Sequence, residues 1–336
     1  MRVLALILLI LLLTPSWSGL ERMPLYSGTP RVTVKPVDLV RSDPARRTIG
    51  PLTYLGGVQL SSRDPAFGGF SAMNVSGTRF RLLSDGGLTF AFTMDDDMQP
   101  SDLAFGRLPD GPGRGWEKRD RDSESMAVDP ATGRVWVGFE RANAVWLYTP
   151  VLDRAIRARA PVEMADWPLN GGAESMARLA SGRFVILSES AWAKGGGRQA
   201  LLFDRDPTDP AARSMAFRLV TPPGYRATEA VELPDGRLLV LARRASLEGG
   251  FTARLLLADI SRIRPGVAIR PAELAHFAGP VIHDNFEALA VTREGGATIV
   301  WIASDDNPPS LFQRTLLLKF RLDLPAPAQS KRRPGR

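Results

Sequence analysis

The sequence predicts an all-β protein folded as a five-bladed β-propeller, and three observations support this. One pattern recurs along the chain: its clearest copy is 124–140, ESMAVDPATGRVWVGFE, and related copies begin at Glu174, Glu229 and Glu287, with an acid-free copy at Ser71. Each copy reads as a hairpin, with a short apolar strand, a turn containing Gly and a second strand of Val, Ile, Leu, Phe and Trp. Successive acid-headed copies lie 50 to 58 residues apart, a period typical of four-stranded blades.

Each unit is expected to continue beyond its hairpin with two more strands. The first strand of each unit lines the central channel, and the second runs antiparallel to it. The fourth strand leads to the next unit. We predict the third strands at 88–93, 144–148, 200–203, 252–260 and 315–322.

The last unit reaches the end of the chain without a fourth strand. The segment 52–60, LTYLGGVQL, reads as a strand with no hairpin before it, so we expect it to complete the last blade and leave no open sheet edge. Within the leader, 19–51, the segment 31–40 is interrupted by Pro36 and is typical of an edge strand. The count fits five blades within 52–322, whereas six blades would need further strands in the leader and in the loop 110–122.

Residues 1–18 read as a secretory signal peptide. One positive charge, Arg2, precedes an apolar run of eleven residues, and small residues stand before Gly19, where we expect cleavage. The run is too short to span a bilayer comfortably, although an uncleaved anchor is the alternative. We therefore expect a periplasmic or secreted protein with no stable membrane span after cleavage. The chain has no Cys, so packing rather than disulfides must stabilise it.

The net charge of +7 does not indicate a nucleic-acid-binding protein, because the excess lies at the two ends of the chain. Without the signal peptide and the tail, 38 basic residues face 36 acidic ones. The tail, 323–336, is Pro-rich and basic and is expected to be disordered. We expect a monomer that binds a small molecule.

The acids that head the units point to a metal site. The first strands of propeller blades line the central channel and the second strands return to the same face, so acids at these positions meet at one mouth. Crowded carboxylates raise one another's pKa unless a cation lies among them, and hard oxygen ligands suit Ca²⁺ before Mg²⁺. Alternatively, the repeated acids only brace the blades by accepting backbone N–H groups. The predicted metal ligands are Glu124, Glu174, Glu229, Glu287, Asp85 and Asp305.

Basic loops on the same face are candidates for substrate binding. Three consecutive glycines, 195–197, lie between Lys194 and Arg198, and Arg121 lies in the loop before Glu124. Glycine amides and flanking cations can bind a phosphate, although each loop alone also fits a flexible polar turn. We also expect the acidic loop 95–97 at this mouth.

His283 is the candidate for proton transfer. It heads the run His283-Asp284-Asn285-Phe286-Glu287, and the predicted catalytic residues are His283, Asp284 and Glu287. The alternative is a surface histidine. The sequence has no Gly-x-Ser-x-Gly elbow, no His-Glu-x-x-His motif, no P-loop and no dinucleotide fingerprint, so a serine-hydrolase reading has no support.

Over 52–322 the chain resembles the family called phytase-like, or esterase-like activity of phytase, of exported bacterial proteins. The shared motifs are the repeated Glu-x-[Met/Leu]-Ala together with LTYLGG at 52–57, DPAFGGFSAM at 64–73, LLSDGG at 82–87, DNFEALA at 284–290 and ASDDN at 303–307. The resemblance implies a propeller whose clustered Asp and Glu carry out phosphoester hydrolysis. The chain departs from the pattern at Ser71, Thr228 and Arg243, which makes the acidic ring unequal.

Three hypotheses follow. The first is a Ca²⁺-dependent phosphoric ester hydrolase, in which the acids hold the ion, Lys194, Arg198 or Arg121 binds the phosphate, and His283 transfers the proton. The second is a carboxylic ester or lactone hydrolase with one divalent ion, for which the basic loops would be dispensable. The third is a non-catalytic binding propeller, because the fold by itself does not decide function.

Overall fold

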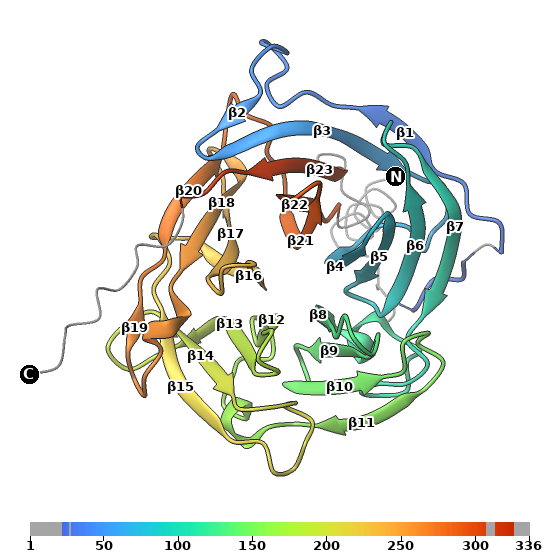
Figure 1. Cartoon of the computed structure of the whole chain (residues 1–336). Coiled ribbons are helices and arrows are strands. Elements are labelled where there is room, and N and C mark those ends of the chain that lie inside the picture. Colours follow the sequence, from blue (N-terminus) through green and yellow to red (C-terminus); the bar gives the residue numbers. More distant parts are fainter. Residues whose placement is uncertain (1–21, 27, 307–312, 326–336) are drawn as a thin grey trace, which may run out of the picture.

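The structure, a computed structural model, describes residues 22–26, 28–306 and 313–325. Five sheets, antiparallel except for one short strand, surround a central channel, with β4, β8, β12, β16 and β21 innermost (Figure 1). The predicted all-β, five-bladed propeller is confirmed. The predicted signal peptide, 1–18, and nearly all of the basic tail lie outside the described residues.

The first three blades follow the chain without interruption. Blade 1 contains β4 (Phe70–Ser76), β5 (Arg79–Ser84), β6 (Leu88–Met94) and β7 (Pro100–Arg107). Blade 2 contains β8 (Ser123–Val128), β9 (Val135–Phe139), β10 (Ala144–Tyr148) and β11 (Ala155–Arg159). Blade 3 contains β12 (Ala173–Arg178), β13 (Phe184–Trp192), β14 (Arg198–Phe203), β15 (Ser214–Leu219) and the short parallel β19 (Ala268–Ile269).

Blade 5 is closed by the N-terminal part of the chain. Blade 4 contains β16 (Arg226–Glu232), β17 (Leu238–Ser246), β18 (Gly250–Ala258) and β20 (Ala272–Phe277). Blade 5 contains β21 (Phe286–Glu294), β22 (Ala297–Ser304), β23 (Thr315–Leu322) and β3 (Leu52–Ser61), flanked by β1 (Thr33–Pro36) and β2 (Thr48–Ile49). The antiparallel pairing of β23 with β3 joins the two ends of the chain as expected. The segment around Pro36 is an edge strand, also as expected.

Apolar side chains pack between neighbouring blades. One cluster joins blades 4 and 5 and β3, and it includes Leu239, Phe277, Phe286, Leu318 and Phe320, all essentially inaccessible to solvent. Similar clusters fill the other blade interfaces. Since each blade buries its faces against two neighbours, the inner strands have fixed positions around the channel.

All the inner strands begin at the same end of the channel, which we call the mouth. Because successive strands are antiparallel, loops before a first strand and loops after a second strand lie on the mouth face. Loops between third and fourth strands lie on the opposite face. The acidic loop 95–97 joins β6 to β7 and therefore lies opposite the mouth, so its predicted placement was wrong.

The loops contain little further regular structure. Short 3-10 helices occupy Lys118–Arg121, Val162–Met164 and Ile260–Arg262. In the loop 110–122, the described residues contain one of these helices and a single bridge from Glu117 to Arg22, but no strand of a sixth blade. Within the described part of the chain, no helix is long and apolar enough to cross a membrane.

Candidate functional site

Every inner strand carries a β-bulge at the mouth, and the bulge determines which side chain enters it. In each blade the pairing of the first two strands skips one residue: Ser71, Glu124, Glu174, Thr228 and Glu287. A bulged residue is not paired with the neighbouring strand, and its side chain points in a different direction from that of a regular strand residue. Such bulges are common beside functional sites. The blade 4 member is thus Thr228, one residue before the predicted Glu229.

The second strands return to the mouth and add a further residue from each blade, as expected. In blades 1, 2, 3 and 5 this residue donates its backbone N–H to a carbonyl just before the inner strand, over 2.8 to 3.4 Å. The repeated bond holds each side chain beside the bulge of its own blade. The five residues are Asp85, Glu140, Glu189, Arg243 and Asp305.

One side of the mouth is organised by Arg243. Its Nη2 lies 3.1 Å from Oε1 of Glu287, 3.5 Å from Oε1 of Glu189 and 3.9 Å from Oε1 of Glu174. Its Nη1 donates to Oδ1 of Asn285 at 2.9 Å, and the amide of Asn285 donates to Glu287 at 3.0 Å. We call this group the Arg243 side.

The charges on the Arg243 side stabilise one another. Burial lowers the pKa of Arg243, but Glu287 and Glu174 outweigh this and hold it above its ordinary value. Burial raises the pKa of Glu287, and Arg243 opposes the rise. Burial and the nearby Glu189 hold the pKa of Glu174 well above its usual range, again against Arg243. The arginine thus supplies positive charge among these acids.

On the other side of the mouth carboxylates converge, and Arg141 and Lys118 lie near Asp122. Asp122, Glu124 and Glu140 each offer an oxygen, and these three atoms lie within 4.8 Å of one another, close enough to hold a metal ion. We call this group the Asp122 side. An oxygen-only set of this kind suits a hard cation such as Ca²⁺ or Mg²⁺.

The carboxyl groups on the Asp122 side have raised pKa values, although Arg141 and Lys118 lower that of Asp122. Burial, with help from Asp85, raises the pKa of Asp122 to about 6. Burial raises the pKa of Glu140 to about 7 although the amide of Gly171 donates to it. Burial and then Glu174 and Asp85 hold the pKa of Glu124 well above its ordinary value. A cation bound here would reverse all three shifts.

Two further cations lie at the edge of the mouth. Nζ of Lys118 lies 2.6 Å from Oδ2 of Asp85, and Nη1 of Arg226 lies 3.2 Å from Oε2 of Glu189. Asp305 is buried and meets the amide of Asn285 at 3.4 Å. The predicted Asp85 and Asp305 therefore lie at the mouth, each beside a polar partner.

Glu229 has a different environment from the other predicted ligands. Its Oε1 accepts the N–H of Ala230 at 2.9 Å, and the neighbouring Met176 and Ser175 moderate a pKa that burial raises well above its usual range. Glu229 thus contacts blade 3, as expected if this acid holds neighbouring blades together. Blades 1 and 4 brace with hydroxyls: Ser71 donates to the carbonyl of Ser123 at 2.6 Å, and Thr228 to that of Phe286 at 3.4 Å.

Two of the three predicted phosphate-binding residues, Arg121 and Arg198, have partners of their own. Arg121 is buried and donates to the carbonyl of Pro112. Arg198 donates to the carbonyl of Ser190 at 2.7 Å and stacks 3.9 Å above the ring of Trp192. Lys194 is exposed at the tip of the glycine loop.

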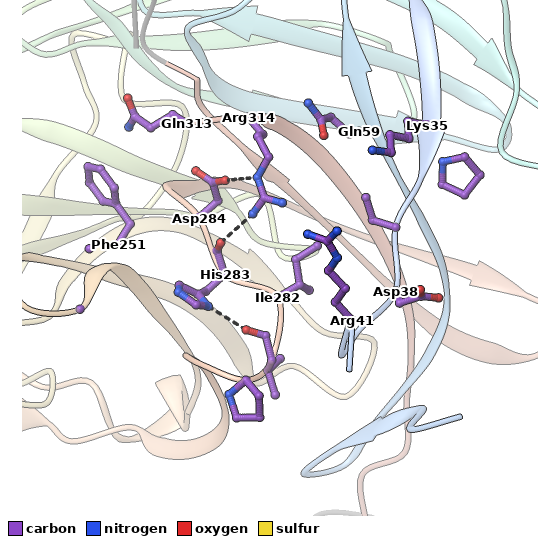
Figure 2. Close-up of a pocket in the computed structure, with 16 residues that line it drawn as sticks. Lys35, Asp38, Arg41, Gln59, Phe251, Ile282, His283, Asp284, Gln313 and Arg314 are labelled. Atoms are coloured by element: carbon purple, nitrogen blue, oxygen red, sulfur yellow. Dashed lines mark hydrogen bonds and ion pairs between the residues drawn. The ribbon is translucent and has the colours of Figure 1, made fainter. Parts of the chain in front are cut away.

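The predicted catalytic run is divided between two places. Glu287 lies in the mouth, whereas His283 and Asp284 line a separate cavity beside it (Figure 2). Asn285 connects the two, because its side chain reaches Glu287 and its N–H donates to Asp284. The roles of His283 and Asp284 in catalysis stay predictions.

Sequence reasoning missed Asp122, placed Glu140 at the mouth without naming it as a metal ligand, and treated Arg243 only as a departure from the ring. A signal for Asp122 existed: it stands two residues before a bulged acid, as Asn285 does before Glu287. Extending the repeat two residues toward the N-terminus would have placed Asp122 at the mouth.

Comparisons with known proteins agree with the predicted family. The family model described as "Phytase-like: Esterase-like activity of phytase" matches residues 65–308. No curated protein sequence matches the chain significantly. Among solved structures, the β-propeller domain of Myceliophteria thermophila Cps50 (Swd1) is similar with a TM-score of 0.36 and 13% identity, over 75% of this chain and 71% of that one.

A luciferin-regenerating enzyme is similar with a TM-score of 0.41 and 11% identity, over 85% of this chain and 95% of that one. Neither likeness bears on activity. The family match covers most of the chain, including both sides of the mouth.

Proposed function

The chain belongs to the phytase-like family, and from that premise we propose that it is a metal-dependent ester hydrolase whose reaction takes place at the mouth of the channel. The observation that carries the proposal is the division of the mouth. One side holds three carboxylate oxygens within 4.8 Å of one another, and the other holds acids already paired with Arg243.

The Asp122 side fits a divalent ion. Its oxygen donors suit Ca²⁺ first and Mg²⁺ second, and burial together with neighbouring carboxylates raises the pKa values of Asp122 and Glu140. Asp122, Glu124 and Glu140 would hold the ion, in place of the wider ring first expected. Once bound, it would supply positive charge to the ester and lower the pKa of water.

The protein's own residues would bind the substrate and move the proton. Glu174 interacts with Glu124 and with Arg243, so it lies between the two sides of the mouth. A carboxylate with a raised pKa can take a proton from water near neutral pH and return it to the leaving oxygen. We assign this role to Glu174 rather than His283, which lines the neighbouring cavity.

Phosphoric esters are the first substrate class that we propose. Lys118, Arg226 and Arg243 all lie among the acids of the mouth and would offset the charge of a phosphoryl group. In this proposal they bind the phosphate, a role that the sequence predicted for Lys194, Arg198 and Arg121. Export to the periplasm or beyond the cell, and a monomeric state, belong to the same proposal.

A carboxylic ester or lactone is the second candidate, and one observation favours it. Arg121 and Arg198 are engaged by backbone carbonyls. These two residues are therefore not free to bind a phosphate, and a neutral substrate needs fewer cations at the mouth.

The test is hydrolysis by the mature, chelator-treated protein with and without Ca²⁺ or Mg²⁺. The substrates are p-nitrophenyl phosphate, bis(p-nitrophenyl) phosphate, p-nitrophenyl acetate and a γ-lactone. Glu124→Gln removes one ligand charge, and Glu232→Gln on the same channel wall but away from the mouth is the matched control. We expect metal-dependent cleavage of a phosphate ester that Glu124→Gln loses and Glu232→Gln keeps.

Each other outcome is informative. Metal-dependent cleavage of only the acetate or the lactone would select the second candidate. A bound metal without turnover of any substrate would contradict the hydrolase proposal and leave a binding propeller. Turnover that persists in the chelated protein and in Glu124→Gln would overturn the metal site.

A further inference from the structure

A cavity of about 800 Å³ opens on the mouth face beside blades 4 and 5. Its walls come from the segment after β1, the tip of the β17–β18 hairpin, the loop before β21 and the residues before β23 (Figure 2). This volume is within the range of about 300 to 1,000 Å³ that is usual for small-molecule sites. The proposed ester hydrolysis makes no use of it.

The polar wall of the cavity carries more positive than negative charge. Three cationic side chains, Lys35, Arg41 and Arg314, face two carboxylates, Asp38 and Asp284. Asp284 is buried and already paired, since its Oδ2 lies 2.9 Å from Nε of Arg314. The cavity is therefore suited to an anion.

The guanidinium of Arg314 is held in one orientation. Besides the bond to Asp284, its Nη2 donates to the carbonyl of His283 at 3.2 Å. Among the described residues, its Nη1 makes no hydrogen bond, and the exposed guanidinium of Arg41 has no partner at all. Figure 2 shows both guanidinium groups turned toward the cavity. Two such groups can bind a carboxylate or a phosphate through several N–H donors.

His283 adds a hydrogen-bond acceptor to the cavity. Its Nδ1 lies 2.7 Å from the carbonyl of Val281, and because a carbonyl only accepts, Nδ1 carries the hydrogen. In the neutral ring Nε2 is then an acceptor. Phe251 and Ile282 provide apolar surface in the same cavity.

We propose that this cavity binds a small organic anion. The carboxylate or phosphate group is bound by Arg41 and Arg314, and the apolar body of the ligand packs on Phe251 and Ile282. This site goes beyond the proposed hydrolysis and does not depend on the metal site. A test in metal-free protein therefore separates the two, because the acidic mouth without a cation repels anions.

The experiment is isothermal titration calorimetry of the chelator-treated full mature chain with phenyl phosphate, benzoate and inorganic phosphate. We expect saturable binding of phenyl phosphate or benzoate, and the better of the two identifies the anionic group. We expect phenyl phosphate to bind at least several-fold more tightly than inorganic phosphate because its ring adds apolar contact. No saturable binding of either organic anion would overturn the proposal.

Variants locate the site. Arg41→Ala removes an exposed side chain that has no partner among the described residues, so it should fold normally and bind about tenfold more weakly. Arg46→Ala, an exposed arginine of the same leader outside the cavity, is the matched control and should bind as the wild type does. Phe251→Ala should remove the preference for phenyl over inorganic phosphate. Equal affinity in Arg41→Ala and Arg46→Ala would place the anion elsewhere and sink the proposal.

Discussion

The two sides of the mouth are built from equivalent positions of the repeat, yet they balance their charge differently. On the Arg243 side, a second-strand position that is acidic in the other blades has become arginine and lies within 4 Å of three glutamates. On the Asp122 side, the corresponding positions remain acidic and three carboxylate oxygens converge.

The difference shows which blades of the repeat contribute to the candidate metal site. Structural devices keep the symmetry of the blades, as the bulge does in all five. One arginine breaks that symmetry and supplies an internal counter-ion to Glu174, Glu189 and Glu287, whereas Lys118 and Arg141 lie near the acids of the Asp122 side. Four experiments test this difference between the two sides, with expected effects that decrease from the first to the fourth.

Arg243→Met should destabilise the protein by about 4 kcal/mol at pH 7, because it leaves Glu174, Glu189 and Glu287 without their cation. Thermal or urea unfolding measures the loss, and Arg244→Met, at an exposed neighbour, is the control. If Arg243 does stand in for a metal ion, the variant should also bind one additional Ca²⁺ per chain. A variant as stable as the control would refute the counter-ion role.

The metal-free protein should lose about 3 kcal/mol of stability between pH 5.5 and pH 7.5. Asp122 and Glu140 have folded pKa values of about 6 and about 7, above their ordinary values of 3.8 and 4.5. Within this window the folded state binds more protons than the unfolded state, so stability falls as the pH rises. Saturating Ca²⁺ should flatten the dependence. Unfolding midpoints across pH measure it, and a metal-free protein that is most stable at pH 7.5 would contradict these shifts.

Glu140→Gln should abolish the stabilisation by Ca²⁺, which for the wild type amounts to about 2.7 kcal/mol when the ion is at a hundred times its dissociation constant. The amide oxygen can still accept from Gly171, so the metal-free variant should fold. Glu189→Gln, the same change on the Arg243 side, should keep the Ca²⁺ effect. Equal responses of the two variants would mean that the ion does not distinguish the two sides.

Ser71→Ala should cost about 1 kcal/mol, because one buried hydroxyl that bonds the carbonyl of Ser123 is lost. Thr228→Ser keeps the hydroxyl in blade 4 but removes one buried methyl group, so it should cost about 0.8 kcal/mol. Neither change should alter the response to Ca²⁺. A changed Ca²⁺ response in Ser71→Ala would show that blade 1 belongs to the metal site.

Much of the fold was predictable because it rests on local patterns. The hairpins and their Gly turns recur with a regular period, and the third strands at 144–148 and 315–322 coincide with β10 and β23. Closure by β3 followed from a last unit without a fourth strand and a first strand without a hairpin. These inferences need only strand alternation, turn chemistry and the cost of an open edge.

The site was predictable only in outline. The repeat placed Glu124, Glu174 and Glu287 correctly, but a bulge shifts register by one residue, and aligning letters alone put Glu229 where Thr228 stands. The acidic loop 95–97 was placed on the wrong face because composition does not say which end of a strand a loop joins. Whether Arg121 and Arg198 could bind a phosphate depended on which backbone carbonyls lay near their guanidinium groups.

By itself, then, the sequence determined the propeller, its closure and the convergence of acids at one mouth, because these follow from periodicity and antiparallel pairing. Only the tertiary structure decided that Arg243 neutralises one half of those acids and that Asp122, Glu124 and Glu140 form the other. The physical reason is that charge balance depends on distances of a few ångströms between different blades. Such distances are set by bulges, loops and blade packing together.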